Sequence, residues 1–151
     1  MKFKKGLIVG FFAGIIRVIL NLLKYKLFKS YYILPALYSP RLNGDPTQWL
    51  LQTALTDLIV GILFGLLFVL LINALPGTKI KRGLGYGFVM WVISELPSLL
   101  TAYTTRMIDL GLITLWGIAG LISSFVIGMG IVFIYDLMLK QEVKDVRYNV
   151  K

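Results

Sequence analysis

Four long runs of apolar residues dominate the pattern of the chain, at residues 7–23, 50–75, 84–100 and 112–139. The hydrocarbon core of a bilayer is about 30 Å thick, so a spanning α-helix needs roughly 17–25 mostly apolar residues. Each run is long enough to span. The pattern therefore predicts an all-α integral membrane protein, a four-helix bundle that forms a single transmembrane domain over residues 1–151.

The capping and helix-breaking residues between the runs predict where the helices begin and end. We expect helices at about 5–27, 46–75, 83–103 and 111–139, an outer interfacial loop at 28–45 and a cytoplasmic tail at 140–151. Asp45 and Pro46 favour a helix start, because Asp is a good N-cap and Pro suits the first helical position. Pro76 and Gly77 favour a helix end. Pro97 should kink the third helix or free a backbone carbonyl.

Small residues recur at helical spacing along one face of each run. Such stripes let helix backbones approach closely, which gives packing contacts that lipid cannot match. The predicted packing positions are Gly6, Gly10, Gly14, Gly61, Gly65, Gly83, Gly87, Gly117, Ser124 and Gly128. The favoured interpretation is tight packing within one four-helix bundle. The alternative for some of these positions is a homo-oligomer interface, and both can hold.

A charged residue lies inside each of the first three runs. Arg17, Asp57 and Glu95 lie at similar depths once the helices alternate in direction. Other polar residues share this depth, whereas the inner half of the runs carries almost none. The candidate pocket residues are Arg17, Asn21, Asp57, Ser94, Glu95 and Ser98. The pattern predicts a polar pocket that opens to the outside and is closed by an apolar inner half.

Three interpretations of this pocket stay open. An ion-pair cluster could fix the register of the helices, since buried charges also pair for structural reasons. Ionisable residues inside spans are, by default, candidates for function. One positive and two negative groups would make the pocket net negative, which favours a small cation, a proton or a cationic solute. A lipid or partner site is the third interpretation.

Other single residues have simpler interpretations. Tyr86 and Tyr135 are predicted as aromatic anchors at the inner interface. Asp136 is predicted to pair with Lys140, four residues later on the same helix face.

Composition narrows the possible functions. The chain has no cysteine and no histidine, which excludes disulfides, the usual zinc sites and Cys–His or Ser–His catalysis. We expect no enzymatic activity, no cofactor and no metal site. The net charge is +9, and the basic residues cluster beside the spans, where they suit anionic lipid headgroups. The segments between the spans are too short for a nucleic-acid recognition module, so we expect no nucleic-acid partner.

The distribution of basic residues predicts the orientation. The termini and the second loop carry ten lysine and arginine residues, whereas the other side carries five. Basic residues near span ends favour the cytoplasmic side. We therefore expect both termini in the cytoplasm and a location in a prokaryotic cytoplasmic (inner) membrane. The basic and apolar start, MKFKKGLIVGFFAGII, is interpreted as an uncleaved first helix.

Two resemblances add to this picture. The segments KGLIVGFFAG at Lys5, DLIVGILFGLLFVLL at Asp57, LPG at Leu75 and KRGLGYGFVMW at Lys81 resemble a family of uncharacterised bacterial membrane proteins with four transmembrane helices. That resemblance implies a fold and no activity. The segment GFFAGIIR at Gly10 is similar to the first helix of small fluoride channels, but the asparagine and phenylalanine–threonine signatures of their later helices are missing.

Taken together, the residues predict a small multi-pass protein with an outward-facing polar pocket. The leading hypothesis is a transport or channel-like function for a small cation, a proton or a cationic solute, carried out by a homo-oligomer. The alternative is a non-catalytic accessory or assembly subunit of a larger membrane complex. The expected partners are membrane lipids and other membrane-protein chains.

Overall fold

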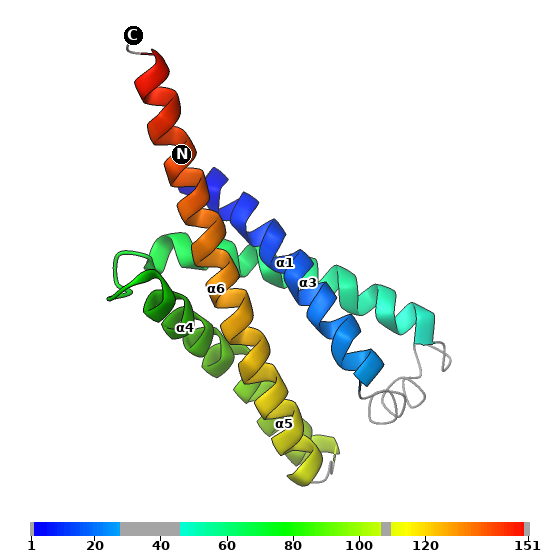
Figure 1. Cartoon of the computed structure of the whole chain (residues 1–151). Coiled ribbons are helices and arrows are strands. Elements are labelled where there is room, and N and C mark those ends of the chain that lie inside the picture. The colour runs from blue at the N-terminus through cyan, green and yellow to red at the C-terminus, as the bar shows by residue number, and fades with distance from the viewer. Residues whose placement is uncertain (1, 28–45, 107–109, 150–151) are drawn as a thin grey trace.

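A computed structural model describes residues 2–27, 46–106 and 110–149 of the chain (Figure 1). The elements in chain order are α1 (Lys2–Leu27), α3 (Pro46–Leu71), α4 (Lys79–Met90), the π-helical turn η1 (Trp91–Glu95), α5 (Leu96–Arg106) and α6 (Leu110–Asn149). α4, η1 and α5 follow one another without a break. The described part of the chain is all-helical, and the predicted outer loop at 28–45 lies outside it.

Four of the described helical stretches are long and apolar enough to cross a membrane. They are Phe3–Leu27, Leu50–Leu71, Lys79–Thr105 and Leu110–Glu142. A stretch of this length and composition is stable in a bilayer because its backbone hydrogen bonds are satisfied internally. The prediction of an integral membrane four-helix bundle is confirmed.

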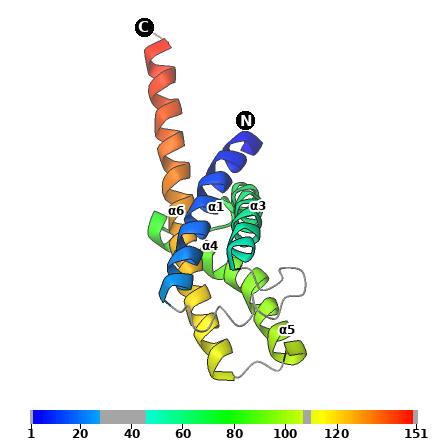
Figure 2. The ribbon, with the colours of Figure 1, turned by 90° about the vertical axis from the view of Figure 1, so that its right-hand side faces the viewer.

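Several helix ends differ from the prediction, and the third helix begins at Lys79 rather than near residue 83. The second helix begins at Pro46 but ends at Leu71 rather than near residue 75, and the turn that follows places Gly77 at φ 97°. This left-handed conformation is easily adopted by glycine, which has no Cβ atom. The fourth helix continues to Asn149 instead of ending near residue 139. Its polar end carries no hydrophobic signal of a span, and α6 therefore extends beyond the other helices (Figures 1 and 2).

The bundle is built from two tightly packed antiparallel pairs, α1 with α3 and α4 with α6. In the first pair, a Cβ atom added at Gly10 would lie only 2.6 Å from the Cα atom of Ile62. Cβ atoms at Gly61 and Gly65 would collide with the backbone of Gly14 and Gly10. The glycines are therefore required at these positions because the two backbones touch.

The second pair, α4 and α6, is also packed through glycines that let the two backbones touch. A Cβ atom at Gly87 would lie 2.9 Å from the Cα atom of Phe125, and one at Gly128 would collide with Gly83 and Gly87. Gly6 and Gly117 also face neighbours, Leu66 and Leu99 respectively, at 3.0 and 3.3 Å. The predicted stripes thus pack within the chain.

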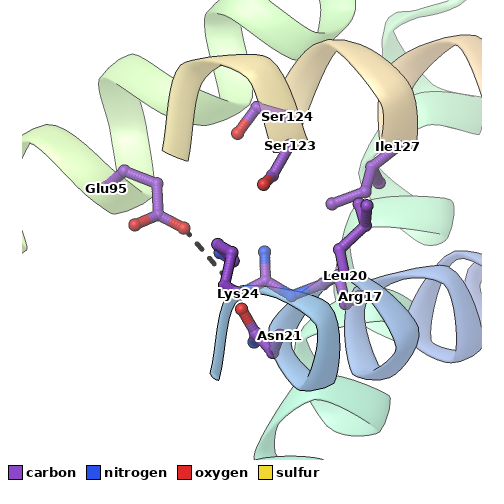
Figure 3. Close-up of a pocket in the computed structure, with 8 residues that line it drawn as sticks. All are labelled: Arg17, Leu20, Asn21, Lys24, Glu95, Ser123, Ser124 and Ile127. Atoms are coloured by element: carbon purple, nitrogen blue, oxygen red, sulfur yellow. Dashed lines mark ion pairs between the residues drawn. The ribbon is translucent and has the colours of Figure 1, made fainter. Parts of the chain in front are cut away.

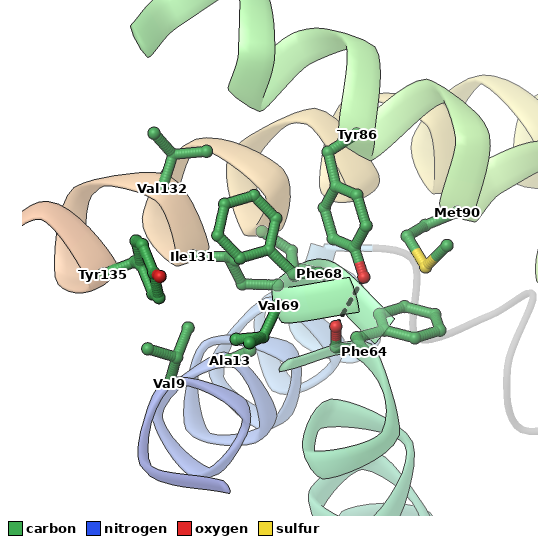
Figure 4. Close-up of a cluster of buried hydrophobic side chains, with 11 residues drawn as sticks. Val9, Ala13, Phe64, Phe68, Val69, Tyr86, Met90, Ile131, Val132 and Tyr135 are labelled. Atoms are coloured by element: carbon green, nitrogen blue, oxygen red, sulfur yellow. Dashed lines mark hydrogen bonds between the residues drawn. The ribbon is translucent and has the colours of Figure 1, made fainter. Parts of the chain in front are cut away.

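The two pairs meet over a cluster of buried apolar side chains (Figure 4). Following the predicted orientation, we call the end of the bundle that carries Lys5 and Lys79 the inner end. The cluster lies in the inner half and consists of Val9, Ala13, Phe64, Phe68, Val69, Tyr86, Met90, Ile127, Ile131, Val132 and Tyr135. This half of the bundle therefore has an apolar core, and its role in closing a pocket stays a prediction.

Two tyrosines of this cluster differ from their predicted role. Tyr86 is fully buried, and its hydroxyl donates a hydrogen bond to the backbone carbonyl of Phe64, which joins α4 to α3. Tyr135 is also buried, and both rings pack edge-on against Phe68. These tyrosines belong to the core rather than to the membrane interface, because the inner turns of α4 and α6 face the other pair.

Ion pairs fasten α6 at the inner end. Lys5 Nζ lies 2.6 Å from Glu142 Oε2, and Lys79 pairs with Asp136. The predicted partner of Asp136 was its own helix neighbour Lys140, and this prediction is wrong. Asp136 instead joins α6 to the start of α4.

Candidate functional site

The candidate site is centred on one face of the outer half of α1. Arg17, Asn21 and Lys24 follow one another at spacings of four and three residues, which places them on the same side of a helix. α3 brings Asp57 to this face, η1 brings Glu95, and α6 brings Ser123 and Ser124. Three of the predicted residues, Arg17, Asp57 and Glu95, therefore come together at one depth.

Asp57 is a buried carboxylate whose two oxygens are both bonded. Arg17 Nε donates to Oδ1 at 3.1 Å, and Asn21 Nδ2 donates to Oδ2. The Asp57 residue is 3% exposed. Hydrogen bonds between ionised partners are about twice as strong as neutral ones, and burial of a charge is tolerated when such partners are present. Asp57 therefore has its charge balanced within the protein and fastens α3 to α1.

Glu95 is held much more loosely. Its Oε1 atom lies 3.9 Å from the Arg17 terminal nitrogen Nη2, which is beyond hydrogen-bond distance. The Glu95 side chain is 30% exposed, against 4% for Asp57. The two carboxylates thus differ in kind, because Asp57 is fully bonded and Glu95 is accessible.

The π-helical turn determines where Glu95 points. The Leu96 N–H donates to the Trp91 carbonyl five residues earlier, instead of four. Pro97 follows directly, and proline has no N–H and clashes with the carbonyl four residues before it, which here is Ile93. The widened turn is the local response, and such turns often occur at functional sites. Trp91 Nε1 donates to the Gly117 carbonyl at 3.1 Å, which holds this turn against α6.

These side chains surround a small open pocket between α1, η1 and α6 (Figure 3). Its lining consists of Arg17, Leu20, Asn21, Lys24, Glu95, Ser123, Ser124 and Ile127. The free space holds about one water molecule. The pocket is therefore small and polar on most sides.

Lys24 changes the predicted charge of the site. The sequence pattern places one positive and two negative groups here, whereas the structure adds the Lys24 ammonium to the lining. Arg17 and Lys24 balance Asp57 and Glu95, so the cluster is neutral rather than net negative. A spacing of seven residues from Arg17 puts Lys24 on the same helix face, and this signal was available in the sequence.

Two predicted pocket residues do not line the pocket. Ser94 donates its hydroxyl hydrogen bond to the Met90 carbonyl, and Ser98 donates to the Ser94 carbonyl. Serine hydroxyls on helices commonly bond the carbonyl four residues earlier, which satisfies them locally. Ser98 is exposed. Ser124, predicted as a packing residue, packs its backbone against Gly87 and also lines the pocket.

A second, roomier pocket lies between α1 and α3. Its lining is mostly apolar and includes Val18, Leu22, Leu50 and Ala54, together with Asn21, Thr53 and Asp57. Asn21 lines both pockets, so the Arg17–Asp57–Asn21 group separates them.

Arg17 also contacts the apolar core. Its guanidinium carbon lies 5.3 Å from the centre of the Phe64 ring, which is within the range of a cation–π interaction. The same Phe64 accepts the Tyr86 hydrogen bond through its carbonyl. Arg17 therefore joins the polar outer cluster to the inner core.

Compared with known proteins, the chain matches no family model, no curated protein and no solved structure. The resemblances to the four-helix family and to fluoride channels stay predictions. What the structure establishes is a small membrane protein with four helices, among its described residues, that are long and apolar enough to cross a bilayer.

Proposed function

We propose that the protein is a small transport or channel-like membrane protein whose outward-facing pocket binds a small cation, a proton or a cationic solute. The observation that carries the proposal is the difference between the two carboxylates. Asp57 is occupied by Arg17 and Asn21, whereas Glu95 is accessible and only loosely paired. A partly exposed carboxylate inside a spanning helix is expensive to maintain, which favours a functional role for Glu95.

Cation flux into reconstituted vesicles tests this proposal. Purified protein is placed in lipid vesicles, and uptake of protons and of labelled monovalent cations is measured. Glu95→Gln should abolish the flux while the folded state is retained. Glu142→Gln is the matched control, because Glu142 pairs with Lys5 at the inner end, far from the pocket. Equal flux in wild type, Glu95→Gln and empty vesicles would contradict the proposal.

The orientation is part of the same proposal. Both termini are placed in the cytoplasm by the distribution of basic residues, so the pocket faces outward. A cysteine at Asn43 should react with a membrane-impermeant thiol reagent in intact cells, whereas a cysteine at Thr78 should not. The reverse pattern would move the pocket to the cytoplasmic side. The chain has no native cysteine to confuse this measurement.

Assembly as a homo-oligomer is also proposed, on a surface other than the glycine stripes. Those stripes pack within the chain, whereas α5 carries exposed hydroxyl residues on one face, Ser98, Thr101 and Thr105. Polar side chains on a membrane-exposed face can hydrogen-bond across helices. Light scattering of the detergent-solubilised protein should give a multiple of the 17.0 kDa chain, reduced when all three residues are changed to alanine. A monomeric wild type would contradict this part.

The long α6 favours a second candidate function, that of an accessory subunit. α6 has 40 residues, and at 1.5 Å per residue it is about twice as long as the hydrocarbon core is thick. Its end extends beyond the other helices (Figure 1) and could dock on a partner. If so, a membrane-protein partner should co-purify with the intact chain and be lost when residues 143–151 are deleted.

A further inference from the structure

A basic residue, Lys24, lines the pocket together with the acidic Glu95 (Figure 3). Lys24 is partly buried, whereas Lys26, two residues later on the same helix, is exposed. The free space beside Lys24 holds only about one water molecule. A larger cargo therefore has no room in the pocket unless a lining side chain leaves.

Ser124 gives a second, independent sign that the pocket is built for a ligand. The residue is 4% exposed and belongs to the lining. Among the residues that the structure describes, its hydroxyl has no hydrogen-bond partner, whereas the neighbouring Ser123 hydroxyl donates to the Ala119 carbonyl at 2.7 Å. The Ser124 hydroxyl is therefore available to hydrogen-bond a water molecule or a bound polar group in the pocket.

The charges restrict what that group can be. Arg17 is occupied by Asp57 at 3.1 Å, which leaves Glu95 and Lys24 as the charges of the pocket that are free to change partner. A free cation would meet the Lys24 ammonium in the pocket and be repelled by it. A cation that replaced the ammonium would find the Glu95 carboxylate and the serine oxygens instead.

We propose that Lys24 is a tethered competitor for the cation site, and that the ligand is a small monovalent cation, such as ammonium or potassium, which takes the place of the Lys24 ammonium beside Glu95. The proposal rests on the proposed function and names the ligand class and a specificity-determining residue for the same pocket. When Lys24 turns outward to the headgroup region, the pocket becomes net negative and enlarges. When Lys24 turns inward, the site is closed to cations.

Cation binding to purified protein tests this directly. Thermal unfolding is followed in detergent while ammonium chloride or potassium chloride is added, and N-methylglucamine chloride, whose cation is too large for the pocket, corrects for ionic strength. A ligand that binds the folded state raises the Tm as its concentration passes the Kd. Lys24→Met should bind ammonium or potassium about tenfold or more tightly than wild type, because a positive charge and a competing side chain are removed.

Matched variants make the outcome specific. Lys26→Met removes a charge from the same turn of α1 outside the lining, and it should bind like wild type. Lys24→Met combined with Glu95→Gln should show no cation-dependent shift in Tm. Lys24→Gln serves as a second variant with the side chain kept polar, and the Tm itself reports whether each variant folds.

The possible results separate this inference from the function on which it rests. Tighter binding by Lys24→Met with no flux in vesicles would support the competitor and overturn the transport function. Flux that depends on Glu95, with cation binding unchanged in both Lys24 variants, would support transport and overturn the competitor. An equal gain in Lys26→Met would also overturn it, since the effect would then come from surface charge alone.

Discussion

The same four helices form an apolar inner half and a charged outer half of this bundle. In the inner half, glycines bring backbones together and a cluster of aromatic and aliphatic side chains fills the space between the helix pairs. In the outer half, charged side chains occupy the centre, and two pockets open beside them. Arg17 lies at the boundary, with Asp57 and Glu95 on one side and the Phe64 ring on the other.

The comparison shows that the close-packed apolar cluster and the two pockets lie in opposite halves of the bundle. The inner cluster is apolar except for tyrosine hydroxyls, and the Tyr86 hydroxyl is bonded to a backbone carbonyl. Under the proposed transport function, a solute would have to pass this cluster, and close-packed cores do not deform continuously.

The largest expected effect comes from breaking the buried ion pair of the outer half. Arg17→Met leaves Asp57 buried without its counter-charge, and breaking such a pair from one side typically costs about 3–5 kcal/mol. The double change Arg17→Met, Asp57→Asn should recover much of the free energy of unfolding. Reversible unfolding in detergent measures each corner of this cycle.

Glu95→Gln sharpens the same prediction as its control. Glu95 is 3.9 Å from Arg17 and partly exposed, so its neutralisation should change the free energy of unfolding far less than Asp57→Asn. If both carboxylate changes cost the same, the distinction between an anchoring and an accessible carboxylate is wrong. If Arg17→Met changes neither stability nor flux, the charged residues do not act as a cluster.

The next effect concerns the glycine contacts, where two glycines on one helix give a matched pair. A Cβ atom at Gly87 would crowd the backbone of Ser124 and Phe125, whereas a Cβ atom at Gly85 would meet nothing within 4 Å. Overpacking typically costs about 1–3 kcal/mol, so Gly87→Ala should lower the free energy of unfolding by that amount. Gly85→Ala should be neutral or slightly stabilising, since alanine is the better helix former. Equal results would mean that α4 and α6 are not in backbone contact.

The positions that could be predicted from the sequence are those in which helical periodicity alone decides. Periodicity places Gly10 and Gly14 on the face where α1 meets α3, and it places Arg17, Asp57 and Glu95 at one depth. The outer interfacial loop that the sequence predicts at 28–45 lies outside the described residues and stays a prediction.

The predictions that differ from the structure concern side chains that had two possible partners. Lys24 at the end of an apolar run suits the headgroups, but it also lines the pocket that contains Glu95. Ser94 and Ser98 share the depth of the charges, yet their hydroxyls bond their own helix. Tyr86 is near a span end but faces the other helix pair. Such choices depend on how the helices rotate about their axes, which composition and spacing do not determine.

A smaller effect is expected in the inner core. Tyr86→Phe keeps the ring that packs on Phe68 but removes the hydrogen bond to the Phe64 carbonyl. A hydrogen bond typically contributes about 1 kcal/mol to stability, so the free energy of unfolding should fall by about that amount. Tyr103→Phe is the control, because Tyr103 is half exposed on α5. A loss as large as that of Arg17→Met would show that the inner half, and not the ion pair, depends most on a polar contact.

The smallest effect is expected from the ion pair at the inner end. Lys5 lies 2.6 Å from Glu142, but the Glu142 side chain is 43% exposed, against 4% for Asp57. Exposed ion pairs contribute about 0–1 kcal/mol, because water and salt screen the attraction and two flexible side chains must be ordered.

Lys5→Gln should therefore lower the free energy of unfolding only slightly in low salt and not at all in 1 M sodium chloride, where the screening length is about 3 Å. Lys4→Gln, on the same turn, is the control for general surface charge, since Lys4 is exposed. The loss in Arg17→Met should depend much less on salt, because the Arg17 and Asp57 side chains are only 14% and 4% exposed and buried pairs are screened less. If the Lys5–Glu142 pair proved as strong and as insensitive to salt as the Arg17–Asp57 pair, burial would not be what separates the two ends of the bundle.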